Sequence, residues 1–356
     1  MKTLAAILQR TRLEQGLKTK DLAEVTGIDQ ALISKFENAK RIPTEDQTRL
    51  LANALRADVK EFENARLAEK VYELLKYTND AHEILALAEE RVEYLTSSRV
   101  FEVQNLNDSL LNSLKRIDVL AAEWRKKKPL NQLQLSKMLE YFKVKYTFES
   151  NQIEGNTLSY RETHLVVNEG ITIGSKSLRE HLEAINHAEA VDFVAEMISK
   201  DNLLTKRTLL ELHSLVLKGI DRKYAGRYRD FPVSIGGSRH VPPDHMMLNQ
   251  LMQDYFMHYM RQRGSMHPVI LAAEMHERLV TIHPFADGNG RTSRLVMNLI
   301  LLSNGYTLAS LKGDYESRIR YYEALESVQI DNDSTPFYEL VCEVVEASLQ
   351  EHLALT

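Results

Sequence analysis

The stretch at residues 283–294 (HPFADGNGRTSR) brings together side chains suited to binding a polyphosphate and reacting at it. Arg291 and Arg294 are three positions apart, so on a helix both guanidinium groups emerge on one face and can bind phosphate oxygens. Asp287 offers the hard carboxylate oxygen that Mg²⁺ prefers. Histidine ordinarily titrates near neutrality, so His283 can accept a proton from an attacking hydroxyl. These residues predict a nucleoside triphosphate site with a general base.

The residues that follow predict how this stretch is positioned. An apolar run at 295–302 ends before Asn304 and Gly305, a pair typical of a helix stop. The stretch is therefore expected to be a loop that leads into a helix N-terminus, where free backbone N–H groups and partial positive charge favour an anion. Gly288 and Gly290 have no Cβ, so a phosphate can approach the backbone. Each feature alone is common, but their order in front of a helix is specific.

Residues 283–294 resemble the signature of Fic-domain proteins, His-Pro-Phe-x-Asp/Glu-Gly-Asn-Gly-Arg-x-x-Arg, at every specified position. The resemblance implies an α-helical protein adenylyltransferase that moves AMP from ATP to a Ser, Thr or Tyr hydroxyl of a target protein and releases pyrophosphate. Positioning and charge neutralisation dominate such chemistry. The resemblance implies that His283 is the general base and that Asp287 is a Mg²⁺ ligand. It implies that Asn289 and the amides of Gly288 and Gly290 contact the α- and β-phosphates. Arg291 and Arg294 would contact the β- and γ-phosphates.

Three alternatives concern the reaction itself. The related Doc proteins phosphorylate their targets, but they typically lack the second glycine, so Gly290 favours AMP transfer. A second possibility is a transcription regulator that binds DNA and senses nucleotide without turnover. A third is an enzyme that also removes AMP from its target, with Glu154 orienting water.

A second segment, residues 150–156 (SNQIEGN), resembles the inhibitory pattern Ser/Thr-x-x-x-Glu-Gly/Asn of the same family. The resemblance implies that Glu154 pairs with Arg294, with Ser150 opening the pattern on an inhibitory helix at about residues 141–156. A carboxylate and a phosphate compete for one guanidinium, so the pairing would exclude the γ-phosphate. From the residues alone, Glu154 could equally be the last acidic residue of an ordinary helix that ends at Gly155 and Asn156.

Two further segments are expected to contact substrates. Residues 233–243 (VSIGGSRHVPP) predict a β-hairpin with a primed Gly-Gly turn, and in the family such a hairpin is a flap that pairs with the target's main chain. The alternative is a plain connector. Tyr322 lies in a segment that resembles the family's adenine-pocket helix, although adjacent tyrosines are often one buried and one half-exposed. The expected flap residues are Val233, Ser234, Ile235, Gly236 and Gly237.

Residues 3–57 predict short helices, and residues 29–38 form one that Asp29 would cap. They resemble the Cro-like helix-turn-helix of phage repressors, except that Ala39 stands where that family often has glycine. The expected core is Leu22, Ala23, Ile28, Ile33 and Phe36. The expected DNA contacts are Gln30, Ala31, Ser34 and Lys35 in the major groove, with Lys40 and Arg41 on phosphates.

Charge gives this domain modest support as a DNA binder. Residues 1–60 carry eleven Lys and Arg against eight Asp and Glu, a net of +3 in a chain of net −5. Duplex affinity depends heavily on neutralised phosphates, so a helical protein-interaction module stays open as an alternative. If DNA is bound, we expect a homodimer, since two half-sites add affinity.

The remaining chain predicts an all-α protein in three parts: a helix-turn-helix domain at 1–63, a helical bridge at 64–129 and a Fic domain at 130–356. The bridge has apolar residues at helical spacing, such as Val71, Leu74 and Leu75, then Ile84, Leu85 and Leu87. Its basic run at 125–128, followed by Pro129, is expected to be a solvated helix end rather than a nucleic-acid contact.

Bulk composition indicates a cytoplasmic protein. Of its 356 residues, 27% are charged, and no apolar run is long enough to span a bilayer. The start of the chain is too soon interrupted by Gln9 and Arg10 to be a secretory signal. Cys342 is the single cysteine, which excludes an internal disulfide, and its apolar surroundings predict a buried thiol.

Overall fold

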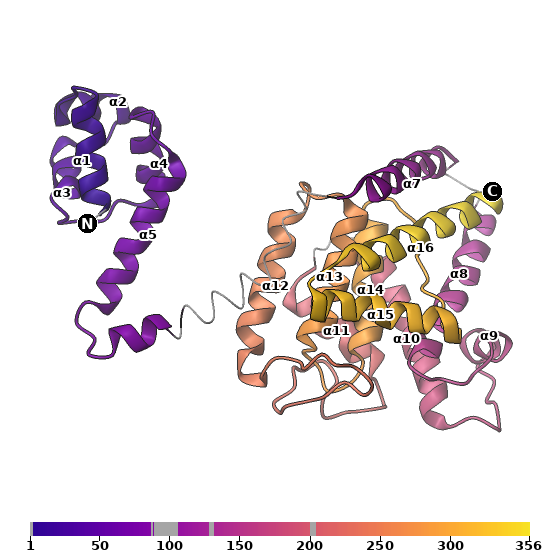
Figure 1. Cartoon of the computed structure of the whole chain (residues 1–356). Helices are drawn as coiled ribbons and strands as arrows, with labels where there is room; N and C mark the ends of the chain where they lie inside the picture. Colours follow the sequence, from indigo (N-terminus) through magenta and orange to yellow (C-terminus); the bar gives the residue numbers. More distant parts are fainter. Residues whose placement is uncertain (1–2, 87, 89–105, 128–131, 200–203) are drawn as a thin grey trace. The chain divides into compact units, whose positions relative to one another are not determined.

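The computed structural model describes residues 3–86, 88, 106–127, 132–199 and 204–356 (Figure 1). The chain forms two compact units, Met1–Glu102 and Val103–Thr356. Every regular element in the described ranges is a helix, which confirms the all-α class predicted from the sequence. Within those ranges, no helix is both long and apolar enough to cross a membrane.

The first unit packs its helices around one small apolar core. Its helices are α1 (Leu4–Glu14), α2 (Thr19–Thr26), α3 (Gln30–Glu37), α4 (Glu45–Ala54) and α5 (Val59–Leu75). The core contains the predicted Leu22, Ile28, Ile33 and Phe36, with Ala23 partly buried against them. The Asp29 side chain accepts from the Leu32 N–H, as predicted for the cap of α3. Gly27 ends α2 in the left-handed conformation and lets the chain turn into α3.

The predicted bridge is only partly described. Helix α5 runs through the expected boundary at residue 63, whereas Leu87 and the end of the basic run at 128–129 lie outside the described residues. Helix α7 (Asp108–Lys127) packs against α16 (Thr335–Ala354) within the second unit. The three-part division of the chain stays a prediction.

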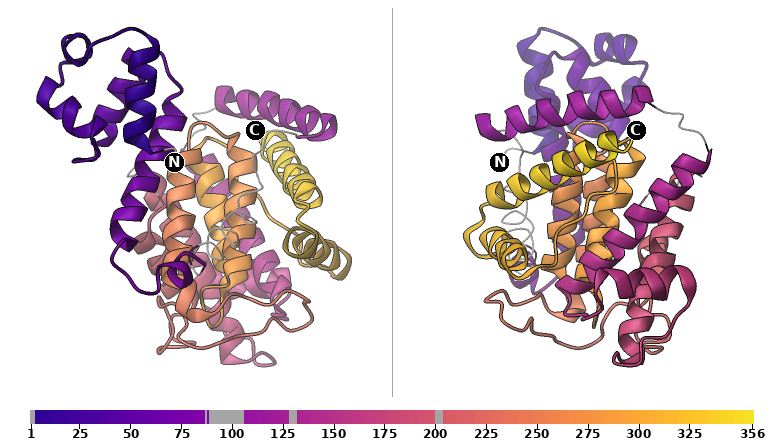
Figure 2. Two further views of the ribbon diagram at one scale, coloured as in Figure 1. Left: turned by 60° about the vertical axis from the view of Figure 1, so that its left-hand side comes forward. Right: turned by 90° about the vertical axis from the view of Figure 1, so that its right-hand side faces the viewer.

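The second unit surrounds a central helix, α14 (Asn289–Ser303), whose side chains are almost all buried. Helix α14 packs along α13 (Pro268–Ile282) and also contacts α8, α10 and α11 (Figure 2). The apolar run at 295–302 is thus the middle of the core. The remaining helices are α8 (Gln132–Ile153), α9 (Tyr160–Glu169), α10 (Leu178–Ser199), α11 (Lys206–Val216), the short η1 (His245–Met247), α12 (Leu248–Gln262) and α15 (Tyr315–Asp331).

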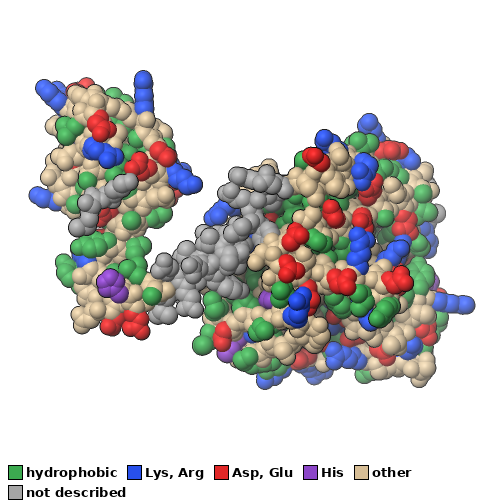
Figure 3. Space-filling view, in the orientation of Figure 1, with side chains coloured by type: hydrophobic (Ala, Val, Ile, Leu, Met, Phe, Trp, Pro, Cys, Tyr) green, Lys and Arg blue, Asp and Glu red, His purple; other side chains and the backbone are tan. Residues whose placement is uncertain are grey.

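Helix α16 closes the unit and buries Cys342, as its apolar surroundings predicted. On the face of this unit shown in Figure 3, basic and acidic side chains are interspersed. An ion pair between Arg320 of α15 and Glu343 of α16 joins these two helices at 2.6 Å. An exposed pair of this kind contributes little to stability. Two buried cations, Arg291 and Arg294, lie instead in the interior, in the first turns of α14.

Candidate active site

The loop between α13 and α14 carries residues 283–288 and has a fixed shape. Helix α13 is capped at its C-terminus by His283 with φ 49°, and α14 begins after Gly288 with φ 77°; both residues are left-handed. The Asn289 side chain closes the loop, because its Nδ2 donates to the Phe285 carbonyl (2.9 Å) and its Oδ1 accepts from the Phe285 N–H (3.0 Å). Since the Asn289 amide is engaged with Phe285, its main-chain N–H is the group left for an anion.

The start of α14 presents unpaired donors. The first backbone bond into the helix runs from the Thr292 N–H to the Gly288 carbonyl (3.0 Å), and Gly288 provides no side-chain cap. The N–H groups of Asn289, Gly290 and Arg291 find no acceptor within the part of the chain described here. We call these three groups, together with the guanidinium groups of Arg291 and Arg294, the anion cradle. Its donors and the helix dipole both favour an anion.

Arg294 is fully buried and is held by the end of α8. Its Nε donates to the Ser150 Oγ (3.0 Å) and its Nη2 to the Ser150 carbonyl (2.8 Å). Nη2 also donates to Oε1 of Glu154 at 2.6 Å. Burial is the largest single effect and would lower the pKa of Arg294, but the charge and hydrogen bond of Glu154 together with the nearby Tyr321 and Tyr146 outweigh it, and the pKa is raised. The structure therefore brings together the Ser150, Glu154 and Arg294 that the sequence singled out.

The Glu154 carboxylate also fills the space above Gly290. A Cβ built on Gly290 would clash with Oε1 of Glu154. Helix α8 ends at Ile153, and Gly155 follows with φ 92°, so Glu154 lies on the turn that leaves the helix. The carboxylate thus occupies the anion cradle.

Arg291 is buried but poorly satisfied. Its Nη1 lies 3.4 Å from Oε1 of Glu183, and its Nη2 lies 3.4 Å from Oδ1 of Asp287. Its Nε and Nη1, and Nη1 of Arg294, have no hydrogen-bond acceptor among the described residues. A buried donor without an acceptor costs about 1–3 kcal/mol, so these atoms indicate a missing polar ligand. Phosphate oxygens fit them.

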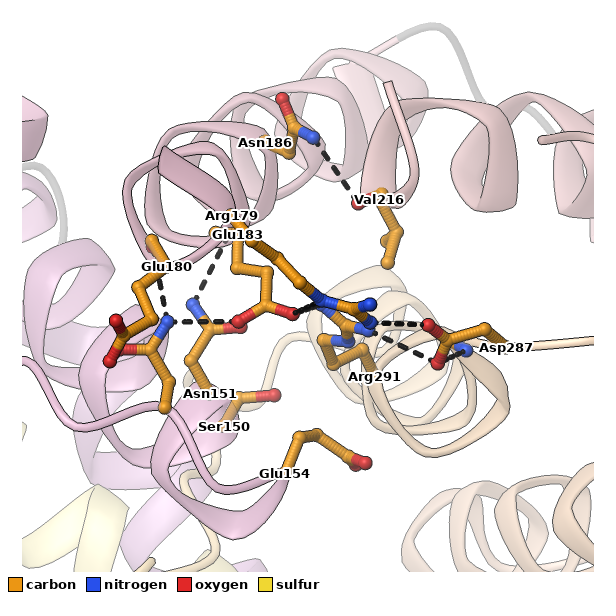
Figure 4. Close-up of polar contacts among 12 residues, drawn as sticks. Ser150, Asn151, Glu154, Arg179, Glu180, Glu183, Asn186, Val216, Asp287 and Arg291 are labelled. Atoms are coloured by element: carbon orange, nitrogen blue, oxygen red, sulfur yellow. Dashed lines mark hydrogen bonds and ion pairs between the residues drawn. The ribbon is translucent and has the colours of Figure 1, made fainter. Parts of the chain in front are cut away.

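Two residues of α10 complete a ring of alternating charges with the motif (Figure 4). Arg179 donates to Oδ2 of Asp287 at 2.7 Å and to Oε1 of Glu183 at 3.1 Å. Glu183 faces Arg291, and Arg291 faces Asp287. Asn156, just after Glu154, donates to the other oxygen of Glu183 (3.0 Å). The ring leaves Asp287 with a cation already beside it.

Asp287 has the chemistry of a divalent-cation ligand. Burial would raise its pKa, but Arg291, the Gly288 N–H and Arg179 outweigh this and lower the pKa, so the carboxylate is ionised. The described residues contain no cluster of three potential protein ligands. A Mg²⁺ ion here would take one oxygen from Asp287 and the others from nucleotide and water, which is how Mg²⁺ is commonly held.

His283 is arranged as a proton acceptor. Its Nδ1 lies 3.2 Å from the Val280 carbonyl, which can only accept, so Nδ1 carries the proton, and Nε2 has no hydrogen-bond partner among the described residues. Burial lowers the pKa of His283 to about 4, against a smaller raising effect of the Val280 carbonyl. The imidazole is therefore neutral at pH 7 and able to accept a proton.

Tyr322 lies beside the segment that carries Glu154. Its hydroxyl donates to the Ile153 carbonyl (3.1 Å), the last carbonyl of α8 and the one directly before Glu154. Tyr321 is buried, whereas 43% of Tyr322 is exposed. Its contact with adenine stays a prediction.

The β-hairpin expected at 233–243 is not formed. A turn is present, with the Ser238 N–H bonded to the Ile235 carbonyl (3.2 Å), but residues 231–243, all described, contain no strand. Gly237 has φ 80°, whereas Gly236 is not in the left-handed region. A positive φ at the second central residue alone is typical of a type II turn, whose twist splays flanking strands; a primed turn needs it at the first.

The predicted DNA contacts all lie on the surface of the first unit. Asp29, at the start of α3, orients that helix, and the residue after its C-cap, Ala39, has φ 53°. This left-handed alanine stands where glycine would be unstrained, as its position suggested. The exposed residues are Gln30, Ala31, Ser34, Lys35, Lys40 and Arg41.

Four residues near the motif escaped the sequence analysis. Arg179 and Glu183 have the i,i+4 spacing of an ordinary solvated helix pair, so spacing gave no signal. His213 of α11 bonds the Asp287 carbonyl through Nε2 (2.9 Å) and accepts from the Gly226 N–H through Nδ1 (2.9 Å). The fourth is Arg229. The phrase GRYR at 226–229 was the only available signal for it.

Comparison with known proteins agrees with this geometry. Residues 203–301 match the Fic/DOC family, and residues 3–65 match a helix-turn-helix domain. The chain is 35% identical over 216 residues to the protein adenylyltransferase Fic of Culex quinquefasciatus, covering 60% of this chain and 42% of that protein. The chain spans about half the length of the curated relatives it matches.

Two solved structures share the fold. One is a Fic-domain-containing signalling protein from Bacteroides thetaiotaomicron, 27% identical with a TM-score of 0.62, covering 67% of this chain and 96% of that one. The other is a fragment of Fic-1 from C. elegans, 25% identical with a TM-score of 0.63, covering 94% of this chain and 96% of that one. The chain therefore contains a Fic domain, preceded by an N-terminal helix-turn-helix domain.

Proposed function

We propose that this protein is a Mg²⁺-dependent protein adenylyltransferase that transfers AMP from ATP to a Ser, Thr or Tyr hydroxyl of a target protein. We also propose that Glu154 holds it in an autoinhibited state. The contact that carries both proposals is the 2.6 Å bond from Arg294 to Glu154, in the position that a phosphate would need. The match to proteins named protein adenylyltransferase Fic supports the reaction.

The anion cradle supports the nucleotide side of this proposal. The free N–H groups at the start of α14 and the unsatisfied atoms of Arg291 would bind phosphate oxygens. Arg294 can bind a phosphate in full only when Glu154 leaves. The Glu154 side chain is 31% exposed, so it lies at the edge of the site and can be displaced outward. Asp287 would hold Mg²⁺, which would neutralise charge on the departing pyrophosphate.

The reaction then needs little further machinery. Nε2 of His283 takes the proton of the target hydroxyl, and that oxygen attacks the α-phosphorus of ATP. The bond from the α-phosphorus to its bridging oxygen breaks, and pyrophosphate leaves. The lowered pKa of His283 supports this role, because the base is already neutral at pH 7.

The segment at 233–237 supports the target side. The backbone groups of Val233 and Ser234 have no hydrogen-bond partner within the described part of the chain, and both residues lie near the surface. An extended peptide could pair with them main chain to main chain, although the segment is not itself a strand. Such pairing would fix the target backbone without reading its side chains.

The test measures transfer from ATP labelled on the α-phosphate into the proteins of a cell lysate. We expect little transfer by the unmodified protein, strong transfer by Glu154→Gly, and none by Glu154→Gly combined with His283→Ala. Glu140→Gln changes an exposed acid of the same helix and should leave the protein inhibited. Label that enters protein from the γ-phosphate instead would indicate a kinase and contradict the proposal.

A second candidate activity is DNA binding by the first unit as a homodimer. The helix-turn-helix match and the exposure of Gln30, Lys35 and Arg41 favour it. This activity is compatible with AMP transfer, since it uses a different unit. We further propose that the protein acts in the cytoplasm, as its charged composition led us to expect.

A further inference from the structure

Arg229 is a buried cation whose side-chain hydrogen bonds end on three backbone carbonyls. It is 3% exposed. Its Nε donates to the His283 carbonyl (2.9 Å), its Nη1 to the Phe231 carbonyl (3.0 Å) and its Nη2 to the Pro243 carbonyl (2.5 Å). Its own N–H donates to the Pro284 carbonyl (2.9 Å). One residue thus joins three separate points of the chain.

These three points are functionally different. Phe231 and Pro243 are the two ends of the segment 231–243, which we call the flap, and its free backbone was assigned above to the target. His283 carries the general base. The Arg229 guanidinium therefore holds the two ends of the flap together and links both ends to His283.

Arginine suits this arrangement better than lysine. Three carbonyls in different directions need the planar fork of a guanidinium, whereas a lysine ammonium is a single point of attachment on a flexible stem. The charge is buried at a cost, because burial lowers the pKa of Arg229 despite the opposing effect of Asp244.

The backbone of His283 needs to be held in place by hydrogen bonds. His283 has φ 49° and ψ 57°, a left-handed conformation that costs a non-glycine residue about 1–2 kcal/mol. Its N–H bonds the Leu279 carbonyl (3.0 Å), and its own carbonyl is held by Arg229. Removing the Nε bond would free the peptide after the base to rotate.

The second half of the flap has other attachments. His240 Nε2 bonds the Thr281 carbonyl (2.9 Å), and Glu326 of α15 accepts from the Arg239 N–H (3.0 Å). In the first half, the Nη1 bond to Phe231 is the polar anchor, and the Phe231 ring also packs on Tyr224. The half that would pair with the target is thus the half that depends on Arg229.

We propose that Arg229 is a positioning residue that sets the target-binding flap and the general base His283 in fixed register. This inference rests on the proposed function. The acceptor hydroxyl must reach Nε2 of His283 while its backbone is held at 233–237, and Arg229 sets the relation between these two places. Arg229 bonds none of the anion cradle, so nucleotide binding should not depend on it.

The experiment compares Arg229→Met and Arg229→Lys, each in the Glu154→Gly background. Arg227→Met is the matched control, since Arg227 is exposed and two positions away. Three quantities are measured: binding of a nonhydrolysable ATP analogue, hydrogen exchange of amides 231–238, and label transferred from ATP into lysate proteins. We expect unchanged analogue affinity, faster exchange, and transfer reduced about 10²-fold in Arg229→Met, the usual effect of a misplaced reacting group. Arg229→Lys should be intermediate.

A pH profile separates positioning from a general loss of structure. Burial is the main cause of the low pKa of His283, and the Arg229 charge adds to it. In Arg229→Met, the acid limb of transfer should therefore move to higher pH. The inference would be overturned if Arg229→Met transferred label and exchanged its flap amides at the rates of the Glu154→Gly parent. It would also be overturned if Arg229→Met lost binding of the ATP analogue as well as transfer of label. If the Glu154→Gly parent transfers no label, the proposed function fails, and the exchange comparison by itself decides whether Arg229 holds the flap.

Discussion

Glu154 and Arg294 lie 140 positions apart in the chain, yet a 2.6 Å bond joins them at the start of α14. Arg294 also bonds Ser150, so the last turn of α8 and the residue directly after the helix supply its acceptors. Glu154 is the only one of these acceptors that carries a charge. Its carboxylate and the γ-phosphate would need the same nitrogen, which makes their binding mutually exclusive.

Replacing Glu154 should therefore strengthen nucleotide binding and lower the thermal stability of the nucleotide-free protein. Glu154→Gln removes the charge that compensates a buried arginine, so we expect a lower Tm without nucleotide. We also expect the affinity for ATP to rise by roughly 10–100-fold, because a charge-assisted hydrogen bond is worth about 1.5–3 kcal/mol. Calorimetry of ATP binding and thermal unfolding with and without ATP check both. Equal ATP affinities in the two proteins would contradict autoinhibition by this residue.

His283 should set the acid limb of activity at an unusually low pH. A general base works in its neutral form, so activity is lost as the pH falls through its pKa, and burial lowers that pKa to about 4. In the Glu154→Gly protein, kcat/KM should stay level from pH 8 down to about pH 5.5, although an ordinary histidine is largely protonated there. His283→Ala should reduce transfer by roughly 10²–10⁴-fold and leave ATP binding intact.

Arg179 should compete with a divalent cation for Asp287. Its 2.7 Å bond to Asp287 is partly exposed, and pairs of this kind are worth about 0.2–1 kcal/mol. Arg179→Met should therefore raise the affinity for Mn²⁺, a probe for Mg²⁺, by about two- to fivefold. Calorimetry with the ATP analogue present measures this. Arg207→Met, which removes the exposed partner of Glu211, is the matched control and should change nothing.

The sequence predicted the local parts of the site well because they depend on short-range chemistry. The loop and helix around Gly288 and the cap at Asp29 followed from helix signals. The pairing of Glu154 with Arg294, 140 positions away, followed instead from the resemblance to the family. The flap conformation did not, because two glycines permit several turns and its ends are fixed by Arg229 from outside the segment. Arg179 and its ring could not be predicted, because α10 meets the motif only through tertiary packing.

Lys40 and Arg41 should contribute to DNA binding by the first unit equally for every DNA sequence, because they are expected to contact phosphates. Both side chains are exposed next to α3, and each phosphate that is no longer neutralised should reduce the slope of log affinity against log salt by about 0.9. Replacing both with alanine should therefore weaken binding to random duplex DNA and lower the slope by roughly two. Lys60→Ala, which removes an exposed lysine from α5, is the control. An unchanged slope would favour a protein-interaction module.

Gly290 offers a test of the anion cradle that does not depend on Glu154 alone. Its φ is not left-handed and it lies in the first turn of α14, so alanine fits the helix backbone and should keep the protein folded. The added Cβ would take the space that the Glu154 carboxylate fills here. If phosphate occupies the same space, Gly290→Ala must block both ligands. The double variant Gly290→Ala, Glu154→Gly should then bind ATP at least tenfold more weakly than Glu154→Gly, a difference of about 1.4 kcal/mol, with an unchanged Tm in the absence of nucleotide. Full ATP affinity in that double variant would show that the phosphates bind elsewhere, and the competition between Glu154 and nucleotide would lose its structural basis.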